Sequence, residues 1–375
     1  MHIALISTSY PDQTPGSEAA GSFVADFAEE LSKYVTVSVL APGRFHDTEF
    51  RGNPAIHRFI VPKLPLSLLS PVRPTHWGAI LKTLFAGQRA VTRLVNTGEI
   101  DHVFALWALP SGYWARNACK PHGIPYSVWA LGSDIWTLGR FRILRAYLKT
   151  VLRECRNLFA DGYVLKKDVE FISGRACEFL PSVRRLPISG KKRIKTGPPY
   201  RLAYLGRWHP NKGIDILLKS LKMLGDKDWK KILEVLICGG GPLEEQVKAG
   251  CYALKSSGRQ VSLHGYLNKA EAARLLLRSD YLLLPSRIES IPVVFSDAMQ
   301  AGCPVITTPV GDLPRILTEY QVGILSAEIS PRAFAAALRS ALRKPPNSYR
   351  KGIGSALADF SVEQSARQLL GFLGA

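Results

Sequence analysis

Two basic residues in the second half of the chain have the types and spacing to bind a diphosphate. Arg207 and Lys212 lie in a short loop between a predicted strand that ends at Gly206 and a predicted helix that opens near Lys212. Ligands of open α/β sheets bind at this edge, and cations beside a helix start suit phosphate groups. A solvated basic turn is the alternative interpretation of this loop taken alone.

Two carboxylates and a glycine turn accompany the basic loop. Glu289 and Asp297 lie eight residues apart, around a predicted helix start near Pro292, and each can accept hydrogen bonds from sugar or ribose hydroxyls. Acids near a helix start are more often simple dipole and capping partners. Another predicted strand runs into Gly239–Pro242, where glycine allows the backbone to approach a ligand, although a tight turn needs glycine for structural reasons too.

Alternating strands and helices must position these residues in both halves of the chain. Strand-like runs are separated by segments with apolar residues at helical spacing, such as Phe23, Phe27 and Leu31. This alternation predicts βαβ units with parallel sheets, an α/β fold. The predicted strands are His2–Thr8, Val35–Leu40, Ala55–Val61, Asp101–Leu106, Pro125–Ala130, Arg201–Leu205, Ile232–Cys238, Val261–His264, Tyr281–Leu284 and Pro304–Thr307.

The length of the chain predicts two domains. A chain of 375 residues exceeds what one hydrophobic core usually organises, and 46% apolar residues can fill two α/β domains. Segment 181–199 is rich in Pro, Gly and basic residues and contains no acidic residue, which is typical of a linker. We therefore predict an N-terminal domain over 1–180 and a C-terminal domain over 200–360.

The three motifs of the second half, taken in order, resemble the donor-binding domain of retaining GT-B glycosyltransferases. The resemblance is to glycosyltransferase family 4, also called glycosyl transferases group 1. The family pattern is Gly-Arg before Lys-Gly, then a Gly-x-Gly-Pro turn, then a Glu followed eight positions later by a second acid. The matching positions here are Gly206-Arg207 with Lys212-Gly213, Gly239 to Pro242, and Glu289 with Asp297.

The resemblance implies a role for each matched position. Arg207 and Lys212 would bind the donor diphosphate and stabilise its negative charge as it leaves, and Glu289 would hold hydroxyls of the transferred sugar. Asp297 stands where the family usually has Glu, and would hold the ribose of the nucleotide. The other implied donor-binding positions are Gly206, Gly240, Gly241, Ser290, the amides around Ile291, Val293 and Val294, and His264, Gly265 and Tyr266, where the family seats the base.

The N-terminal half matches the family more loosely. Gly16 lies at the place of the family's glycine-rich loop, and Gly132 and Asp134 match a His-Gly-x-Asp segment in which Leu131 replaces the His. The resemblance implies a GT-B fold, with two Rossmann-like doubly wound domains facing a cleft. It also implies that segment 361–375 packs back on the N-terminal, acceptor-side domain.

The function implied by the resemblance is transfer of a sugar, with retention, from a nucleoside diphosphate sugar to a hydroxyl acceptor. We expect a lipid-linked or cell-surface glycan acceptor, and neither a cofactor nor an essential metal. Asp226 and Asp228 form an Asp-x-Asp, but they follow a predicted helix end near Gly225 and are interpreted as surface acids. The alternatives are a sugar-nucleotide epimerase of the same architecture and a noncatalytic protein that binds sugar nucleotides or glycans.

The charge of the chain predicts an anionic partner. Lys and Arg number 49 against 30 Asp and Glu, a net charge of +19, yet no nucleic-acid-binding signature is present. Segment 139–156 carries an apolar stripe beside a basic stripe, both at helical spacing. This helix either lies on an anionic membrane, aided by the basic cluster of 181–199, or packs on the core with its basic face in solvent.

Cysteine usage and the N-terminus predict the location of the protein. The chain opens directly on a predicted strand, with no leader segment and no apolar run near the roughly 18 residues that suggest a membrane span. The six cysteines are scattered singly, without metal-ligand spacing. We expect a cytoplasmic protein, peripheral on the inner face of the membrane, with reduced and mostly buried cysteines.

Overall fold

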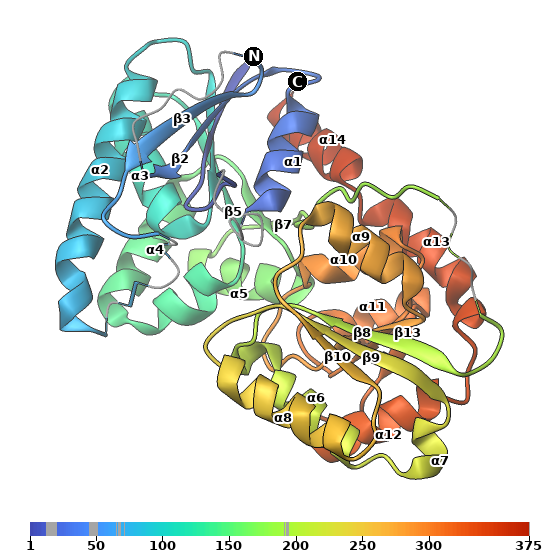
Figure 1. The fold of residues 1–375 in the computed structure, drawn as a ribbon. Coiled ribbons are helices and arrows are strands. Elements are labelled where there is room, and N and C mark those ends of the chain that lie inside the picture. Colours follow the sequence, from blue (N-terminus) through green and yellow to red (C-terminus); the bar gives the residue numbers. More distant parts are fainter. Residues whose placement is uncertain are drawn as a thin grey trace. The chain divides into compact units, whose positions relative to one another are not determined.

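The computed structural model describes residues 1–12, 21–44, 52–64, 66, 69–70, 72–190, 192 and 195–374, and it divides the chain into two units. The first unit comprises Met1–Ser182 and Val362–Ala375, and the second comprises Val183–Ser361. Each unit is built on one parallel sheet with helices around it (Figure 1). The predicted fold class, two Rossmann-like α/β domains, is confirmed.

The sheet of the first unit has seven strands in the order β3-β2-β1-β4-β5-β6-β7. Its central strands are buried along their whole length, as parallel strands covered on both faces are. The strands are β1 (His2–Ile6), β2 (Thr36–Gly43), β3 (Ala55–Ile60), β4 (His102–Leu106), β5 (Tyr126–Ala130), β6 (Leu158–Ala160) and β7 (Glu178–Phe179). The helices are α1 (Ser22–Leu31), α2 (Trp77–Val95), α3 (Tyr113–Cys119), α4 (Arg142–Glu154), α5 (Tyr163–Ser173) and α14 (Val362–Leu373).

The end of the chain belongs to the first unit. Helix α14 packs against α1, and Ser365 Oγ donates to Pro181 O at 3.1 Å. The ring of Phe372 meets that of Phe159 edge-on, with centroids 5.5 Å apart. These contacts join the end of the chain to parts of the first unit at least 184 residues earlier in the sequence.

The sheet of the second unit has six strands in the order β10-β9-β8-β11-β12-β13. The strands are β8 (Tyr200–Leu205), β9 (Ile232–Cys238), β10 (Val261–His264), β11 (Tyr281–Leu284), β12 (Val305–Thr307) and β13 (Gly323–Leu325). The helices are α6 (Ile214–Lys222), α7 (Asp226–Trp229), α8 (Glu244–Ser256), α9 (Lys269–Arg278), α10 (Val293–Gln300), α11 (Leu313–Tyr320), α12 (Pro331–Ala341) and α13 (Arg350–Asp359).

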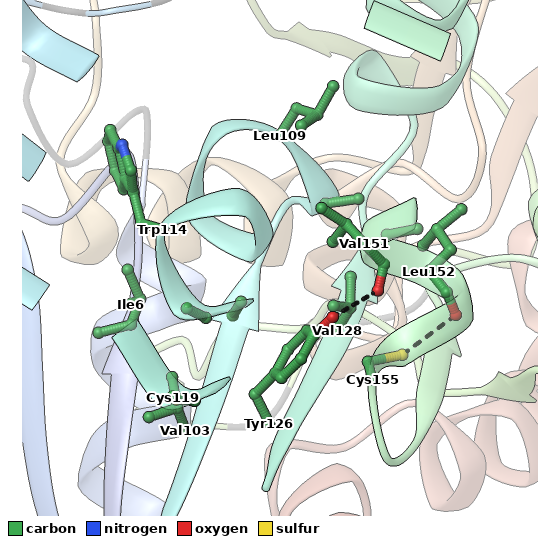
Figure 2. Close-up of a cluster of buried hydrophobic side chains, with 14 of the residues drawn as sticks. Ile6, Val103, Leu109, Trp114, Cys119, Tyr126, Val128, Val151, Leu152 and Cys155 are labelled. Carbon is green, nitrogen blue, oxygen red and sulfur yellow. Dashed lines mark hydrogen bonds between the residues drawn. The ribbon is translucent and has the colours of Figure 1, made fainter. Parts of the chain in front are cut away.

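Helix α4 packs its apolar stripe into the core of the first unit. Leu148, Val151 and Cys155 are at most 3% exposed and belong to the same buried cluster as Trp114 of α3 (Figure 2). Core packing, one of the two interpretations of segment 139–156, therefore holds for these residues, whereas Phe141 at the start of the stripe is 40% exposed. The basic residues beside the stripe, Arg142, Arg145, Lys149 and Arg153, are exposed.

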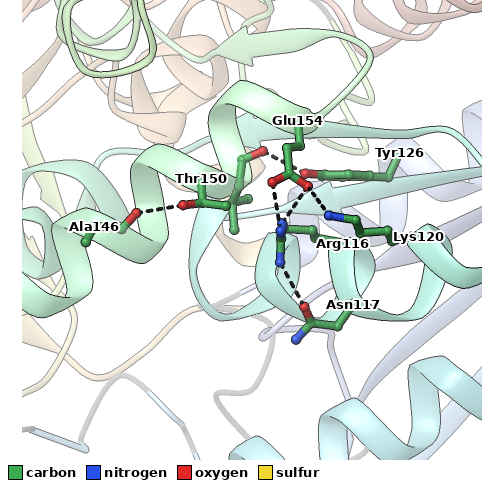
Figure 3. A network of polar contacts seen from close by, with 8 residues as sticks. Arg116, Asn117, Lys120, Tyr126, Ala146, Thr150 and Glu154 are labelled. Carbon is green, nitrogen blue, oxygen red and sulfur yellow. Dashed lines mark hydrogen bonds and ion pairs between the residues drawn. The ribbon is translucent and has the colours of Figure 1, made fainter.

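The one acidic residue of α4 is neutralised by cations from the neighbouring helix region. Glu154 accepts from Arg116 at 2.7 and 3.0 Å and pairs with Lys120 at 3.4 Å (Figure 3). The outer face of α4 is therefore strongly positive. No helix in the described part of the chain is long and apolar enough to cross a membrane.

The six cysteines are free and buried, which confirms their predicted environment. Burial raises the pKa of the Cys119 and Cys155 thiols to about 12, so they remain protonated near neutral pH.

Candidate functional site

The residues predicted to bind the diphosphate and the sugar lie on two loops at the switch point of the second sheet. Strand order reverses between β8 and β11, which are neighbours in the sheet although other elements separate them in the sequence. Arg207 and Lys212 follow β8, and Glu289 follows β11. Parallel strands end at the same edge, and the crevice at such a reversal is where open α/β sheets bind ligands.

Lys212 and Glu289 meet across these two loops. Lys212 Nζ donates to Glu289 Oε1, and Ser286 Oγ donates to the same oxygen at 3.1 Å. The Glu289 side chain is 11% exposed and that of Lys212 is 36% exposed. A cation and a carboxylate that partly neutralise each other, yet remain open to solvent, can separate to contact an anionic ligand that carries hydroxyls.

Arg287 clamps the basic loop to the loop of Glu289, a role that the sequence reading missed. Its Nη1 and Nη2 donate to the two carboxylate oxygens of Asp215, each at 2.7 Å, and Nη1 also donates to Pro210 O at 2.6 Å. Its backbone N–H donates to Asn211 O at 2.7 Å. A planar guanidinium suits this forked pairing, so Arg287 fixes the turn that presents Lys212.

The glycine turn after β9 packs tightly against the other loops. A Cβ on Gly240 would lie 2.6 Å from the ring of Tyr266, and Gly241 has a φ of +145°, which favours glycine. Tyr266 Oη donates to Gly240 O at 2.8 Å, and Trp208 N donates to the same oxygen at 2.8 Å. Glycine is therefore required here for close packing. The same packing brings Tyr266, predicted to lie near the nucleotide base, to the edge of the sheet that carries Arg207.

Several predicted donor-binding positions are open at this edge, and others are buried. Arg207 is exposed, and among the described residues no carboxylate pairs with it. Ser290 is buried, and its Oγ has no hydrogen-bond partner within the described part of the chain. This hydroxyl beside Glu289 is therefore available to bond to a ligand. Of the remaining positions, His264 and Gly265 are exposed, Gly206, Val293 and Val294 are half-buried, and Ile291 is buried.

Asp297 differs from the other residues predicted to bind the donor in its burial and its partner. Its side chain is wholly buried and paired with Arg184. Sequence reasoning gave no signal for this partner, because Arg184 precedes Asp297 by 113 residues.

In the first unit, the predicted acceptor-side residues Gly132 and Asp134 shape the local backbone. Asp134 is 1% exposed, and its carboxylate accepts from Ala108 N at 2.6 Å and Leu131 N at 3.3 Å. Burial raises the pKa of Asp134 to about 6. Gly132 has a φ of +94° and precedes this turn. Gly16 lies outside the described residues.

Trp107 lies at the switch point of the first sheet, and sequence reasoning did not single it out. It follows β4, which neighbours β1 at the reversal of strand order, and it has a φ of +68° that is rare for a residue other than glycine. Its ring meets that of Phe23 edge-on at 6.1 Å.

The Asp-x-Asp of the second unit follows the end of α6, as predicted, and lies in the first turn of α7. Asp226 pairs with Arg259 at 2.6 Å, and Asp228 pairs with Arg339 at 3.1 Å. The described residues contain no group of acids, histidines or cysteines that could hold a metal ion.

Comparisons with known proteins show which family the second unit is similar to. Residues 188–356 match the family described as glycosyl transferases group 1. The D-inositol 3-phosphate glycosyltransferase of Corynebacterium glutamicum (strain R) is 30% identical over 161 residues, which are 40% of this chain and 37% of that protein. A Bacillus subtilis (strain 168) glycosyltransferase named for teichuronic acid biosynthesis is 25% identical over 347 residues, 86% of this chain and 84% of that protein.

Solved structures share the fold of the whole chain. Sucrose-phosphate synthase from Thermosynechococcus elongatus has a TM-score of 0.77 at 17% identity, covering 99% of this chain and 98% of that one. Anabaena Alr3699/HepE in complex with UDP has a TM-score of 0.73 at 17% identity, covering 100% and 99%. The chain therefore has the GT-B fold, and residues 188–356 within its second unit are similar to the glycosyl transferases group 1 family.

Proposed function

We propose that the chain is a retaining glycosyltransferase that moves a sugar from a nucleoside diphosphate sugar to a hydroxyl acceptor. The observation that carries the proposal is the contact of Lys212 with Glu289 at the switch point of the second sheet, with Arg207 exposed in the same basic loop. Relatives named as glycosyltransferases support the reaction class, and the Anabaena protein named with UDP-glucose supports the donor class.

The chemistry follows from the charges at this edge. A bound diphosphate draws Lys212 away from Glu289, which leaves the carboxylate to accept hydrogen bonds from sugar hydroxyls. The bond between the anomeric carbon and the phosphate oxygen breaks while the acceptor oxygen bonds to the same face of that carbon. Arg207 and Lys212 stabilise the negative charge of the leaving diphosphate, whose oxygen takes the acceptor's proton. These cations supply the charge that a metal ion would otherwise provide, so we propose a metal-independent reaction.

A screen of sugar nucleotides tests the proposal. Thermal shift with UDP-, GDP- and ADP-sugars identifies the donor, and we expect one base to stabilise the wild type far more than the others. A transferase releases the free nucleoside diphosphate only when an acceptor is present, whereas an epimerase interconverts the sugar without one. A donor that binds but is never turned over would support the noncatalytic alternative instead.

We further propose a lipid-linked or cell-surface glycan acceptor, met at an anionic membrane through the exposed basic face of α4 and the basic residues of 181–199 other than Arg184, which is paired with Asp297. The support is the positive outer face of α4, whose one acid is already paired, and the net charge of +19. Such attraction is screened within about 8 Å at physiological salt, so binding to anionic vesicles should weaken steeply as salt rises.

Sedimentation with vesicles tests the membrane proposal. Replacement of Arg142, Arg145, Lys149 and Arg153 by Gln should reduce binding to phosphatidylglycerol vesicles and leave donor affinity unchanged. The matched control replaces four exposed lysines of the second unit by Gln, which removes the same charge. Equal losses in both variants would point to net charge rather than this face, and equal binding to anionic and neutral vesicles would refute the proposal. The control lysines are Lys219, Lys222, Lys227 and Lys230.

A further inference from the structure

The carboxylate of Asp297 is paired with Arg184 through both of its oxygens. Arg184 Nε donates to Asp297 Oδ1 at 2.9 Å and to Oδ2 at 3.0 Å, and Arg184 Nη2 donates to Oδ2 at 2.6 Å. The Asp297 side chain is 0% exposed and that of Arg184 is 14% exposed. Both oxygens of the carboxylate therefore have a charged donor in a site that solvent does not reach.

The same helix holds the backbone beside Arg184. Gln300, one turn after Asp297 on α10, donates through Nε2 to Arg184 O at 2.7 Å, and its Oε1 accepts from Leu186 N at 2.9 Å. Asp297 and Gln300 thus tie α10 to the first residues of the second unit, where Val183 and Leu186 are buried. The contacts are within one unit and fix the rotation and depth of the helix.

The start of α10 lies at the proposed donor edge. The helix begins at Val293, four residues after Glu289, and the amides of Val293 and Val294 are predicted donor contacts. The first amides of a helix have no partner inside the helix, so their use by a ligand depends on where the helix is held. A displacement of the helix of about 1 Å is enough to impair such contacts strongly.

We infer that Asp297 is a positioning residue, which orients α10 for the donor through its buried pair with Arg184 and does not hold the ribose itself. The inference rests on the proposed function for the identity of the ligand. A ribose hydroxyl that replaced Arg184 at the carboxylate would break a buried, charge-assisted pair, and such losses are costly. We therefore expect the ribose to be held by other groups.

A melting experiment without ligand tests the pair. Asp297→Asn and Arg184→Gln should each lower the melting temperature by roughly 5 °C or more, and the double variant should lose little beyond either single change. Additive losses would overturn the inference, because they would mean that the two side chains do not act on each other.

Nucleotide titration then separates positioning from ribose binding and from a merely structural role. At a temperature where both variants are folded, Asp297→Asn and Arg184→Gln should each lower the affinity for UDP roughly tenfold. Both should lower the affinity for 2′,3′-dideoxy-UDP by the same factor. A loss for UDP alone in Asp297→Asn would show a ribose contact and overturn the inference. Unchanged affinities in both variants would show a merely structural pair and also overturn it.

A control variant and a choice of nucleotide complete the design. Asp228→Asn breaks another ion pair of the second unit, with Arg339, and should leave UDP affinity at the wild-type value. ADP and GDP, with their dideoxy forms, replace UDP if either stabilises the wild type more. If none of the three binds the wild type, the proposed function is refuted, while the melting cycle still decides whether Arg184 holds Asp297.

Discussion

Arg287→Lys should loosen the loop that presents Lys212, although it keeps the positive charge. The guanidinium makes three hydrogen bonds, two to Asp215 and one to Pro210 O, at 2.6 to 2.7 Å. An ammonium group cannot reproduce this fork. Hydrogen bonds to charged groups contribute roughly 1.5 to 3 kcal/mol each when buried, but the Arg287 side chain is 37% exposed, so solvent screens much of this. We expect a net loss of about 1 to 2 kcal/mol in the free energy of unfolding.

The pH dependence of this loss has a definite sign. The hydrogen bond from Arg287 lowers the pKa of Asp215 below its ordinary value, outweighing the opposing effect of burial. A group whose pKa is lower in the folded state stabilises the fold above its unfolded pKa, and this contribution disappears as pH falls through the folded pKa. The difference between wild type and Arg287→Lys should therefore be full at pH 7 and should shrink below about pH 4.

Urea denaturation and transfer kinetics measure the two consequences. Because Arg287 holds the turn before Lys212, we expect kcat for transfer to fall roughly tenfold, equivalent to about 1.4 kcal/mol in the barrier. Arg315→Lys is the control, since Arg315 pairs with Glu319 at 3.6 Å where both side chains are more than half exposed, and it should change stability by a few tenths of a kcal/mol at most. Wild-type stability and wild-type kcat in Arg287→Lys would refute the conclusion that Arg287 fixes the turn before Lys212.

Three further predictions concern the two units separately. Arg207→Ala and Lys212→Ala should each raise the barrier to transfer by roughly 2 to 4 kcal/mol with the fold intact by circular dichroism, and near-wild-type turnover in both would contradict the assigned site. Transfer should survive excess EDTA, and a complete loss that Mg²⁺ restores would argue against a metal-independent reaction. Because burial raises the pKa of Asp134 to about 6, the wild type should lose stability relative to Asp134→Asn by roughly 2 to 3 kcal/mol as pH rises from about 4 to 7. Parallel pH profiles of urea denaturation for the two proteins would contradict that assignment.

The sequence by itself determined the strands and the order of the loops. Ile232–Cys238, Val261–His264 and Tyr281–Leu284 have the predicted limits, because buried parallel strands are short apolar runs bounded by glycine, proline or charged residues. Strands β6, β7 and β13 were missed, since runs of two or three residues carry too little periodicity to be distinguished from loop.

The same local pattern placed Arg207, Lys212 and Glu289 at strand ends. It could not determine that Lys212 and Glu289 meet, because that contact joins loops 77 residues apart and depends on β8 and β11 being neighbours in the sheet. Strand order is chosen by the packing of the whole unit, which no window of sequence contains.

Tertiary structure also decided what identical chemical groups do in different surroundings. In the sequence, Asp297 and Glu289 are both carboxylates near the start of one helix. In the structure, Asp297 is buried against Arg184, whereas Glu289 is partly exposed beside Lys212. The apolar stripe of α4 was equally compatible with lipid and with protein, and the sheet beneath it made it core. Residue type sets which interactions a side chain can make, but burial and distant partners, which only the folded chain brings together, select among them.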